Sequence, residues 1–314
     1  MTIAELYAAE PTWLIGSVFV LSLLIGSFLN VVIHRLPIMM EREWRQQAEA
    51  ILHPDNGNPE STSTEPSDVG LQPDLQDDRT PPTKYNLIVP RSACPRCGSQ
   101  ITALQNIPVI SWLLLKGKCA QCAAPISIRY PLIELATALL SAVVAWRFGC
   151  TAQMGAALLM TWVLVALCMI DVDHQLLPDD MTLPLMWLGL FLSLFHGQIL
   201  PITPTDAIVG ALAGYLSLWL VFHAFKALTG KEGMGYGDFK LLAALGAWLG
   251  WQQLPLIILL SACVGAVVGI SLIVIRGRDR NLPIPFGPYL AAAGWIAMLW
   301  GEQIVAAYLH SLQT

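Results

Sequence analysis

The chain has 314 residues, of which 55% are hydrophobic and only 12% charged, and its mean hydropathy is +0.59. A soluble domain averages about 25% charged residues, so this composition excludes an ordinary soluble protein and predicts a membrane protein. The net charge of −5 provides no basic surface of the kind that binds nucleic acid.

Eight apolar segments follow one another along the chain, and most approach the ~20 residues that a membrane-spanning helix needs. They are 13–33, 130–148, 153–170, 182–199, 206–228, 239–252, 254–275 and 286–309. The sixth is short and rich in glycine. The first has neither a basic leader nor a small-residue cleavage site, so we expect a retained helix and not a signal peptide. The predicted fold class is an all-α, polytopic integral membrane protein with about eight transmembrane helices.

Lys and Arg indicate how these helices are oriented. If the N-terminus lies outside, the inner loops are 34–129, 171–181, 229–238 and 276–285. When helix ends are counted with their nearest loop, sixteen of the seventeen Lys and Arg fall inside, and only Arg147 falls outside. This is the positive-inside bias of membrane proteins. We therefore expect the four inner loops to face the cytoplasm.

The longest inner loop, 34–129, has three parts. Residues 38–52 carry apolar side chains at helical spacing, which fits either an interfacial amphipathic helix or an ordinary packed helix. Residues 53–84 are rich in Pro, Ser, Thr and Asp. They hold too little apolar surface to offset the entropy of ordering, so we expect a disordered linker.

The third part of the loop carries two copies of C-x-x-C, CPRCGSQI and CAQCAAPI, which contain Cys94, Cys97, Cys119 and Cys122. Twenty-one residues separate the pairs, close to the spacing of two-knuckle zinc sites. Four thiolates suit one structural zinc ion. Disulfides are the alternative, but a cytoplasmic location disfavours them. The remaining cysteines, expected to be packing residues, are Cys150, Cys168 and Cys263.

Two aspartates lie at the cytoplasmic ends of apolar helices. Asp171 closes the run WVLVALCMI, and Asp238 opens the run after GMGYG. A carboxylate near hydrocarbon is costly, so it usually pairs, faces a cavity or does chemistry. Two carboxylates brought together share one proton, activate water and protonate a leaving amine. An aspartyl hydrolase, a proton-coupled transporter and a purely structural helix-capping role all fit these residues.

Other polar residues near these helix ends have competing interpretations. Asp179 and Asp180 precede a helix and fit N-cap positions, while Asp173 fits a solvated loop acid. Lys240 could stabilise a neighbouring carboxylate, although snorkelling toward the headgroups is favoured.

Further candidates lie on other segments of the same face. Glu134 fits either a ligand for the substrate's amine or an interhelical partner. Asn30 and His34 fit contacts to a substrate or donor, but structural roles are favoured. Pro285 and Gly287 are expected to shape a broken helix start that lines the site.

In this order the motifs resemble those of the bifunctional type IV prepilin peptidases, which are inner-membrane leader peptidases and N-methyltransferases. The resemblance covers nearly the whole chain. It rests on the four-cysteine module and on GSFLNVVIHRLP at 26–37, RYPLIEL at 129–135, DVDHQLLPD at 171–179, GMGYGDFKLLAALGAWLG at 233–250 and IPFGPYL at 284–290. Gly-x-Gly-Asp alone is weakly specific, but together with the cysteines it is highly specific.

The resemblance implies that Asp171 and Asp238 are the catalytic pair. They would cleave prepilins and type II secretion pseudopilins on the cytoplasmic side, after the glycine that ends a basic leader. The enzyme would then methylate the new N-terminal residue, commonly phenylalanine, with S-adenosylmethionine as donor. By analogy the donor site lies around the cysteine module and GSFLN, with Gly117 as one candidate. A peptidase without methyltransferase activity, or a secretion scaffold, is the alternative.

The resemblance also implies a bacterial inner-membrane location, with prepilin precursors and the lipid bilayer as partners. The expected organisation is an N-terminal helix in 1–33, the cytoplasmic insertion 34–129 with its zinc module at 94–122, and a seven-helix peptidase domain in 130–314. The linker 53–84 looks long for the family, but it interrupts none of the matched motifs.

Overall fold

A computed structural model describes residue 7 and residues 10–52, 85–102, 104–231, 233–276 and 285–311. The expected linker 53–84 lies outside these residues. The helices are α2 (Pro11–Leu52), α3 (Ile110–Leu114), α4 (Arg129–Phe148), α5 (Ala152–His174), α6 (Asp179–Ser193), α7 (Pro204–Thr229), α8 (Tyr236–Leu249), α9 (Leu254–Arg276) and α10 (Gly287–Ser311), with short 3-10 turns η2 (Leu104–Asn106) and η3 (Trp251–Gln253). The described residues include isolated β-bridges but no strands. The all-α prediction is confirmed.

Each of the eight predicted apolar segments contains a helix. Six of the described helices are long and apolar enough to cross a membrane. The other two, α6 and α8, have 15 and 14 residues, fewer than the ~20 of a full span. The polytopic class is therefore confirmed, while a count of eight crossings stays a prediction.

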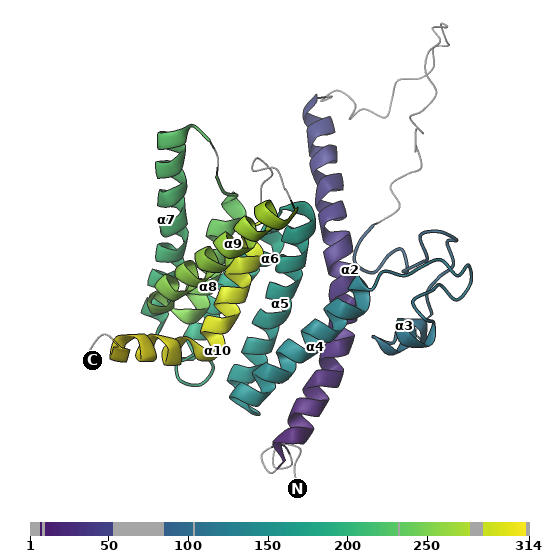
Figure 1. Cartoon of the computed structure of the whole chain (residues 1–314), viewed down its shortest axis with the longest axis horizontal. Helices are drawn as coiled ribbons and strands as arrows, with labels where there is room; N and C mark the ends of the chain where they lie inside the picture. Colours follow the sequence, from purple (N-terminus) through teal and green to yellow (C-terminus); the bar gives the residue numbers. More distant parts are fainter. Residues whose placement is uncertain are drawn as a thin grey trace, which may run out of the picture.

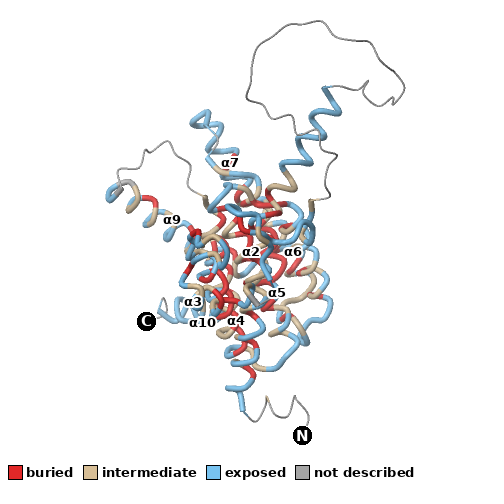
Figure 2. The backbone as a smooth tube through the Cα atoms, turned by 90° about the vertical axis from the view of Figure 1, so that its right-hand side faces the viewer, coloured by how far each residue is buried: buried red, intermediate tan, exposed pale blue. Residues whose placement is uncertain are grey.

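The bundle is organised around α5. This helix packs against α2 and α4 on one side and against α10 on the other (Figure 1). Helices α6, α7 and α9 gather around α8 on the far side of α10. Buried positions concentrate in the middle of the bundle, while the C-terminal parts of α7 and α9 are largely exposed (Figure 2). As a result α5, α8 and α10 meet inside the molecule.

The helix α2 continues without a break through the segment 38–52. Residues 41–52 are exposed, so of the two expected interpretations an ordinary packed helix is wrong for this part. Pro37 lies inside this helix and is buried. Its neighbour Arg35 is 7% exposed and donates to the carbonyl oxygens of Asn86 and Pro90 at 2.9 and 2.6 Å. These bonds satisfy a buried guanidinium and fix the start of the second half of the insertion against α2.

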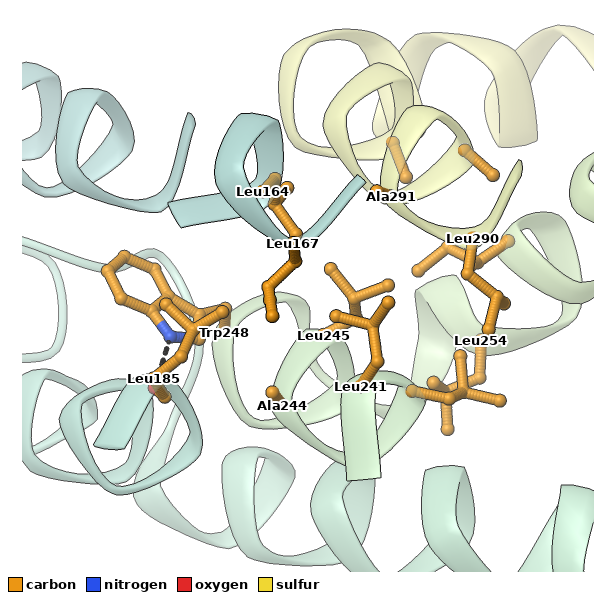
Figure 3. Close-up of a cluster of buried hydrophobic side chains, with 14 of the residues drawn as sticks. Leu164, Leu167, Leu185, Leu241, Ala244, Leu245, Trp248, Leu254, Leu290 and Ala291 are labelled. Carbon is orange, nitrogen blue, oxygen red and sulfur yellow. Dashed lines mark hydrogen bonds between the residues drawn. The ribbon is translucent and has the colours of Figure 1, made fainter. Parts of the chain in front are cut away.

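The short helix α8 forms the centre of the core. From Phe239 to Trp248 all of its residues except Lys240 are buried. Leu241 and Leu245 belong to the same buried cluster as Leu164 and Leu167 of α5, and the indole of Trp248 donates to the Leu185 carbonyl at 2.7 Å (Figure 3). A helix that is apolar on all sides is buried on all sides. The packing of the surrounding helices therefore stabilises α8 inside the bundle, although it has only 14 residues.

Glycines allow α7 to approach α8 at backbone distance. A Cβ atom placed on Gly210 would lie 2.2 Å from the Gly246 carbonyl oxygen, and one on Gly214 would lie 2.6 Å from the Leu242 carbonyl oxygen. Small residues at helix crossings give this close packing within membranes. The crossing fixes α8, and with it Asp238, against α7.

Candidate active site and metal centre

The two predicted aspartates lie on different helices and meet at one end of the bundle. Asp171 is in the last turn of α5, and Asp238 is in the first turn of α8. They are 5% and 6% exposed, and their carboxyl groups are near enough for direct electrostatic interaction. Residues 67 positions apart in the chain therefore form one buried acidic pair.

The start of α10 closes this pair from a third side. The Gly287 amide donates to Asp171 Oδ2 at 3.0 Å. A Cβ atom on Gly287 would lie 2.6 Å from the same oxygen, so the contact requires glycine. We had expected Gly287 to shape a helix start that lines the site, and the structure adds a direct bond to the carboxylate.

The loop between α5 and α6 packs between the helices that carry the site. Leu177, 7% exposed, contacts both α8 and α10. A Cβ atom on Gly237 would lie 2.7 Å from Leu177 Cβ, and one on Gly287 would lie 3.1 Å from Leu177 Cδ1. Gly237 and Gly287 therefore leave room for the Leu177 side chain, which packs between the starts of α8 and α10.

Two ion pairs hold this region. Arg129, the first residue of α4, binds both carboxylate oxygens of Asp173, which remains exposed but belongs to α5 and not to a loop. Lys240 binds both oxygens of Asp179 at 2.6 and 2.7 Å, so it has the carboxylate neighbour that one of the two interpretations required. Asp179 and Asp180 lie in the first turn of α6, where the N-cap is Pro178. The N-cap assignment was therefore wrong by one residue for Asp179 and by two for Asp180, because Pro178 has the extended backbone geometry of the N-cap.

The remaining polar candidates connect the insertion to the membrane helices. Glu134, 8% exposed, accepts a hydrogen bond from the Val109 amide at 2.8 Å. It also interacts with the Ser27 hydroxyl of α2, so its partners are a backbone group of the insertion and, as one of the two interpretations expected, a side chain of a neighbouring helix. Asn30 donates to the Tyr130 carbonyl at 3.1 Å, which confirms a structural cross-helix bond. The first contact ties the insertion to α4, and the second ties α2 to α4.

The four cysteines of the insertion converge. Their Sγ atoms all lie within 4.8 Å of one another, and those of Cys94 and Cys122 are 3.8 Å apart. Four sulfurs placed about 2.3 Å from a tetrahedral zinc ion would be about 3.8 Å apart. The donor set and its spacing therefore fit zinc.

The two C-x-x-C segments form equivalent turns. The Cys94 amide donates to the Ser99 carbonyl at 2.9 Å, and the Cys119 amide donates to the Ala124 carbonyl at 2.8 Å. The fifth residue of each turn has positive φ, +69° at Gly98 and 55° at Ala123. This repeated geometry directs two thiols from each turn toward one centre.

Backbone amides of the second turn stabilise a thiolate. Hydrogen bonds from the amides of Cys122 and Gln121 lower the pKa of Cys119 to about 6. At Cys122 the bond from the Ala124 amide acts in the same direction, but desolvation and the other cysteine thiols raise its pKa to about 11. Charge therefore accumulates first on Cys119, and a cation at the centre would stabilise the remaining thiolates.

Gly117 has a structural reason to be glycine. Its φ is +68°, and a Cβ atom there would lie 2.9 Å from the Trp112 ring. Its carbonyl accepts from the Ile126 amide at 2.7 Å, and the Trp112 indole donates to the Ile126 carbonyl at 3.1 Å. The next residue, Ser127, lines a polar cavity of about 230 Å³ between α2, α4 and α5. Gly117 thus supports a wall of this cavity.

Comparisons with known proteins agree with this arrangement. The bacterial peptidase A24 N-terminal domain matches residues 20–148, and the type IV leader peptidase family matches residues 158–270. The chain belongs to the type IV leader peptidase family. The expected resemblance is confirmed.

Curated relatives extend the match over the whole chain. A prepilin leader peptidase/N-methyltransferase from Aeromonas salmonicida is 58% identical over 99% of this chain and 100% of its own length. Proteins of the same name from Pseudomonas aeruginosa and Legionella pneumophila are 53% and 43% identical, over 99% and 92% of this chain and 98% and 92% of their own lengths. No solved structure gives a significant match.

Sequence reasoning overlooked several residues that hold the helices and the insertion in place. Leu177 and Arg129 had not been singled out, and Arg35 had been counted only as a positive-inside charge. Leucine in the motif DVDHQLLPD carried no signal beyond its apolar character. The two arginines stand in matched motifs next to apolar segments, and that position could have indicated buried or bidentate partners.

Proposed function

We propose that the protein cleaves the leader peptide from prepilins and type II secretion pseudopilins and then methylates the new N-terminal residue. The observation that carries this proposal is the buried pair Asp171 and Asp238, held at one end of the bundle in a chain of the type IV leader peptidase family. Relatives over the full length bear the name prepilin leader peptidase/N-methyltransferase. In this proposal the aspartates are the catalytic residues.

The pair supports hydrolysis by acid–base catalysis. Two neighbouring carboxyl groups with little exposure share one proton, so one accepts a proton from water while the other protonates the leaving amine. The Gly287 amide holds one oxygen of Asp171 and leaves its other oxygen to act on water. The chemistry needs only the two side chains, a water molecule and a peptide bond held between them.

The location of the pair supports cleavage at the cytoplasmic surface of the bacterial inner membrane. Arg129 and Lys240 lie at the same end of the bundle as the aspartates, whereas Arg147 lies at the other end of α4. The positive-inside bias then assigns the aspartates to the cytoplasmic side. A substrate helix in the bilayer would present its leader junction at this depth, where water is accessible.

We place the methyl donor, S-adenosylmethionine, at the junction of the insertion and the membrane helices. The polar cavity there is lined by Asn30, His34, Arg129 and Asp173, and Gly117 supports its wall. The donor would supply the methyl group, while these residues would bind and orient it. The zinc ion would have a structural role, because the four-cysteine cluster leaves no coordination position for a reactant.

A cleavage assay tests the peptidase. The protein in liposomes is given a substrate with a basic leader ending in glycine, followed by an apolar helix that begins with phenylalanine. We expect Asp171→Asn and Asp238→Asn to lower the rate by about 10³-fold or more, and Asp180→Asn, an exposed acid of the same region, to retain it. If both variants of the pair still cut, the carboxylates are structural or handle protons, and the peptidase proposal fails.

The mass of the product tests the methyltransferase. With the donor present, the new N-terminus should gain ~14 Da, one methylene. Gly117→Ala should reduce donor binding and methylation while cleavage continues. Gly98→Ala is the matched control, because it also has positive φ but nothing within 4 Å of its added Cβ. Equal loss in both variants would indicate a general distortion of the module and would remove Gly117 from the donor site.

A further inference from the structure

A second, larger cavity of about 400 Å³ lies at the end of the bundle opposite the aspartates. It is lined by the N-terminal part of α5 and the C-terminal part of α8, whereas Asp171 ends α5 and Asp238 begins α8. Along α5 the two places are about 27 Å apart, close to the thickness of a bilayer's hydrocarbon core. The cavity therefore belongs to the other membrane face and not to the peptidase site.

One cationic side chain and one anionic side chain line this cavity. Arg147 Nε donates to the Leu299 carbonyl at 2.9 Å, and its terminal nitrogen Nη2 lies 2.6 Å from the amide oxygen of Gln303. These bonds orient the guanidinium and leave Nη1 without a partner among the described residues. Glu302, beside Gln303 on α10, lines the same cavity, and no ion pair joins it to Arg147. Both charges are therefore available to a ligand.

Gln253, which lines the cavity, also carries an unsatisfied acceptor. The amide oxygen of Gln253 is buried and has no hydrogen-bond partner in the described part of the chain. A Cβ atom on Gly301 would lie 2.4 Å from this oxygen, so the glycine allows Gln253 to turn toward α10. A buried acceptor without a donor costs about 1–3 kcal/mol, and a ligand carrying N–H groups would remove that cost.

Exposed indole rings mark this end of the bundle as the level of a lipid headgroup. Trp146, next to Arg147, is 65% exposed, and Trp251, near Gln253, is 49% exposed. Tryptophan concentrates at membrane–water interfaces. At this depth the headgroups of the surrounding bilayer are the nearest polar ligands.

We propose that the cavity binds the headgroup of a phospholipid with a primary ammonium, as in phosphatidylethanolamine. Its phosphate accepts from Arg147, and its ammonium donates to Glu302 and to the amide oxygen of Gln253. Phosphatidylcholine matches the charges but has no ammonium N–H, and phosphatidylglycerol has no ammonium at all. The site therefore distinguishes three common headgroups by hydrogen bonding as well as charge.

Native mass spectrometry of the full chain in detergent tests this proposal. We expect phosphatidylethanolamine to be retained about tenfold better than phosphatidylcholine, since one lost buried hydrogen bond is worth roughly 1.4 kcal/mol. Arg147→Gln, Glu302→Gln and Gln253→Met should each reduce that retention. Gln198→Met is the matched control, because Gln198 lies in the α6–α7 connection outside the cavity. Thermal unfolding identifies any variant that fails to fold, and Glu302→Gln, at an exposed position, provides a conservative test.

Three results would overturn the assignment. Equal retention of all three lipids would exclude recognition of the ammonium. Undiminished retention by both Arg147→Gln and Glu302→Gln would exclude the cavity as the place of binding. Displacement of the lipid by soluble O-phosphoethanolamine at equal concentration would show that the ligand is a free zwitterion and not a membrane lipid.

Discussion

The backbone amide of Gly287 donates to Oδ2 of Asp171 at 3.0 Å, and these residues are 116 positions apart in the chain. This bond joins the start of α10 to the end of α5. It fixes the orientation of one proposed catalytic carboxylate, because it occupies one of the two oxygens.

Gly287→Ala tests whether this contact positions the carboxylate. The added Cβ would lie 2.6 Å from Asp171 Oδ2, so the side chain or α10 must move. We expect peptidase activity to fall by about tenfold or more, since a displacement near 1 Å can cost about 10²-fold. Gly155→Ala on α5 is the control, because nothing lies within 4 Å of its added Cβ. Wild-type activity in Gly287→Ala would contradict a positioning role.

The ion pair between Lys240 and Asp179 offers a second prediction. Both side chains are partly exposed, at 28% and 50%, so the pair should contribute no more than about 1 kcal/mol to stability. It nevertheless joins the start of α6 to the turn of α8 that follows Asp238. We expect Lys240→Met to lower the peptidase rate several-fold while the melting temperature changes little.

Exchanging the two charges distinguishes an effect of breaking the ion pair between α6 and α8 from an effect of removing the positive charge of Lys240. Lys240→Asp combined with Asp179→Lys should recover part of the activity that either single substitution removes. If the fold-losses of the two single variants multiply in the double variant, the two residues act independently.

Zinc should be released in acid, at a pH below about 6. Without metal, the pKa of the Cys119 thiol is lowered to about 6 by backbone hydrogen bonds, and a bound cation keeps the thiolates deprotonated to a lower pH still, because metal and protons compete for them. Thiolates, not thiols, bind the metal. Metal analysis should find one zinc per chain at neutral pH, and a chromogenic indicator should report its release in acid.

Substitution of the ligands should give the same result at neutral pH. We expect Cys119→Ser to lose the metal and Cys150→Ser, which lies outside the tetrad, to keep it. Cleavage should continue without zinc, because the aspartates lie on α5 and α8 and not on the insertion. A metal-free wild-type protein at neutral pH would refute the zinc assignment.

The fifth residue of the two cysteine turns is alanine in one and glycine in the other, so exchanging these residue types should change the stability of the module in opposite directions. Ala123 adopts φ 55° where the equivalent residue of the first turn is Gly98 at φ +69°. A non-glycine residue in this region costs about 1–2 kcal/mol. We therefore expect Ala123→Gly to stabilise the module by about 1 kcal/mol and Gly98→Ala to destabilise it similarly. Competition with a chelator would measure both, and the same sign of change in both variants would contradict the equivalence.

The sequence by itself determined the class of the molecule and its local motifs. Membrane helices follow from runs of apolar residues, and the cysteine turns follow from C-x-x-C spacing, because both depend on residues close together in the chain. The position of the two aspartates at helix ends is also a local property. Each of these features could be assigned without knowing which helices are neighbours.

Only the tertiary structure decided which partners these residues have. Glu134 binds the Val109 amide, Arg129 binds Asp173, and Gly287 binds Asp171. A sequence motif does not show which partner each residue has. Hydrogen bonds and ion pairs act over a few ångströms in space, whereas these partners are 25, 44 and 116 positions apart in the chain. The burial of the short helix α8 has the same origin. Its glycines and leucines indicate close packing, but the surrounding helices that provide that packing come from the whole fold.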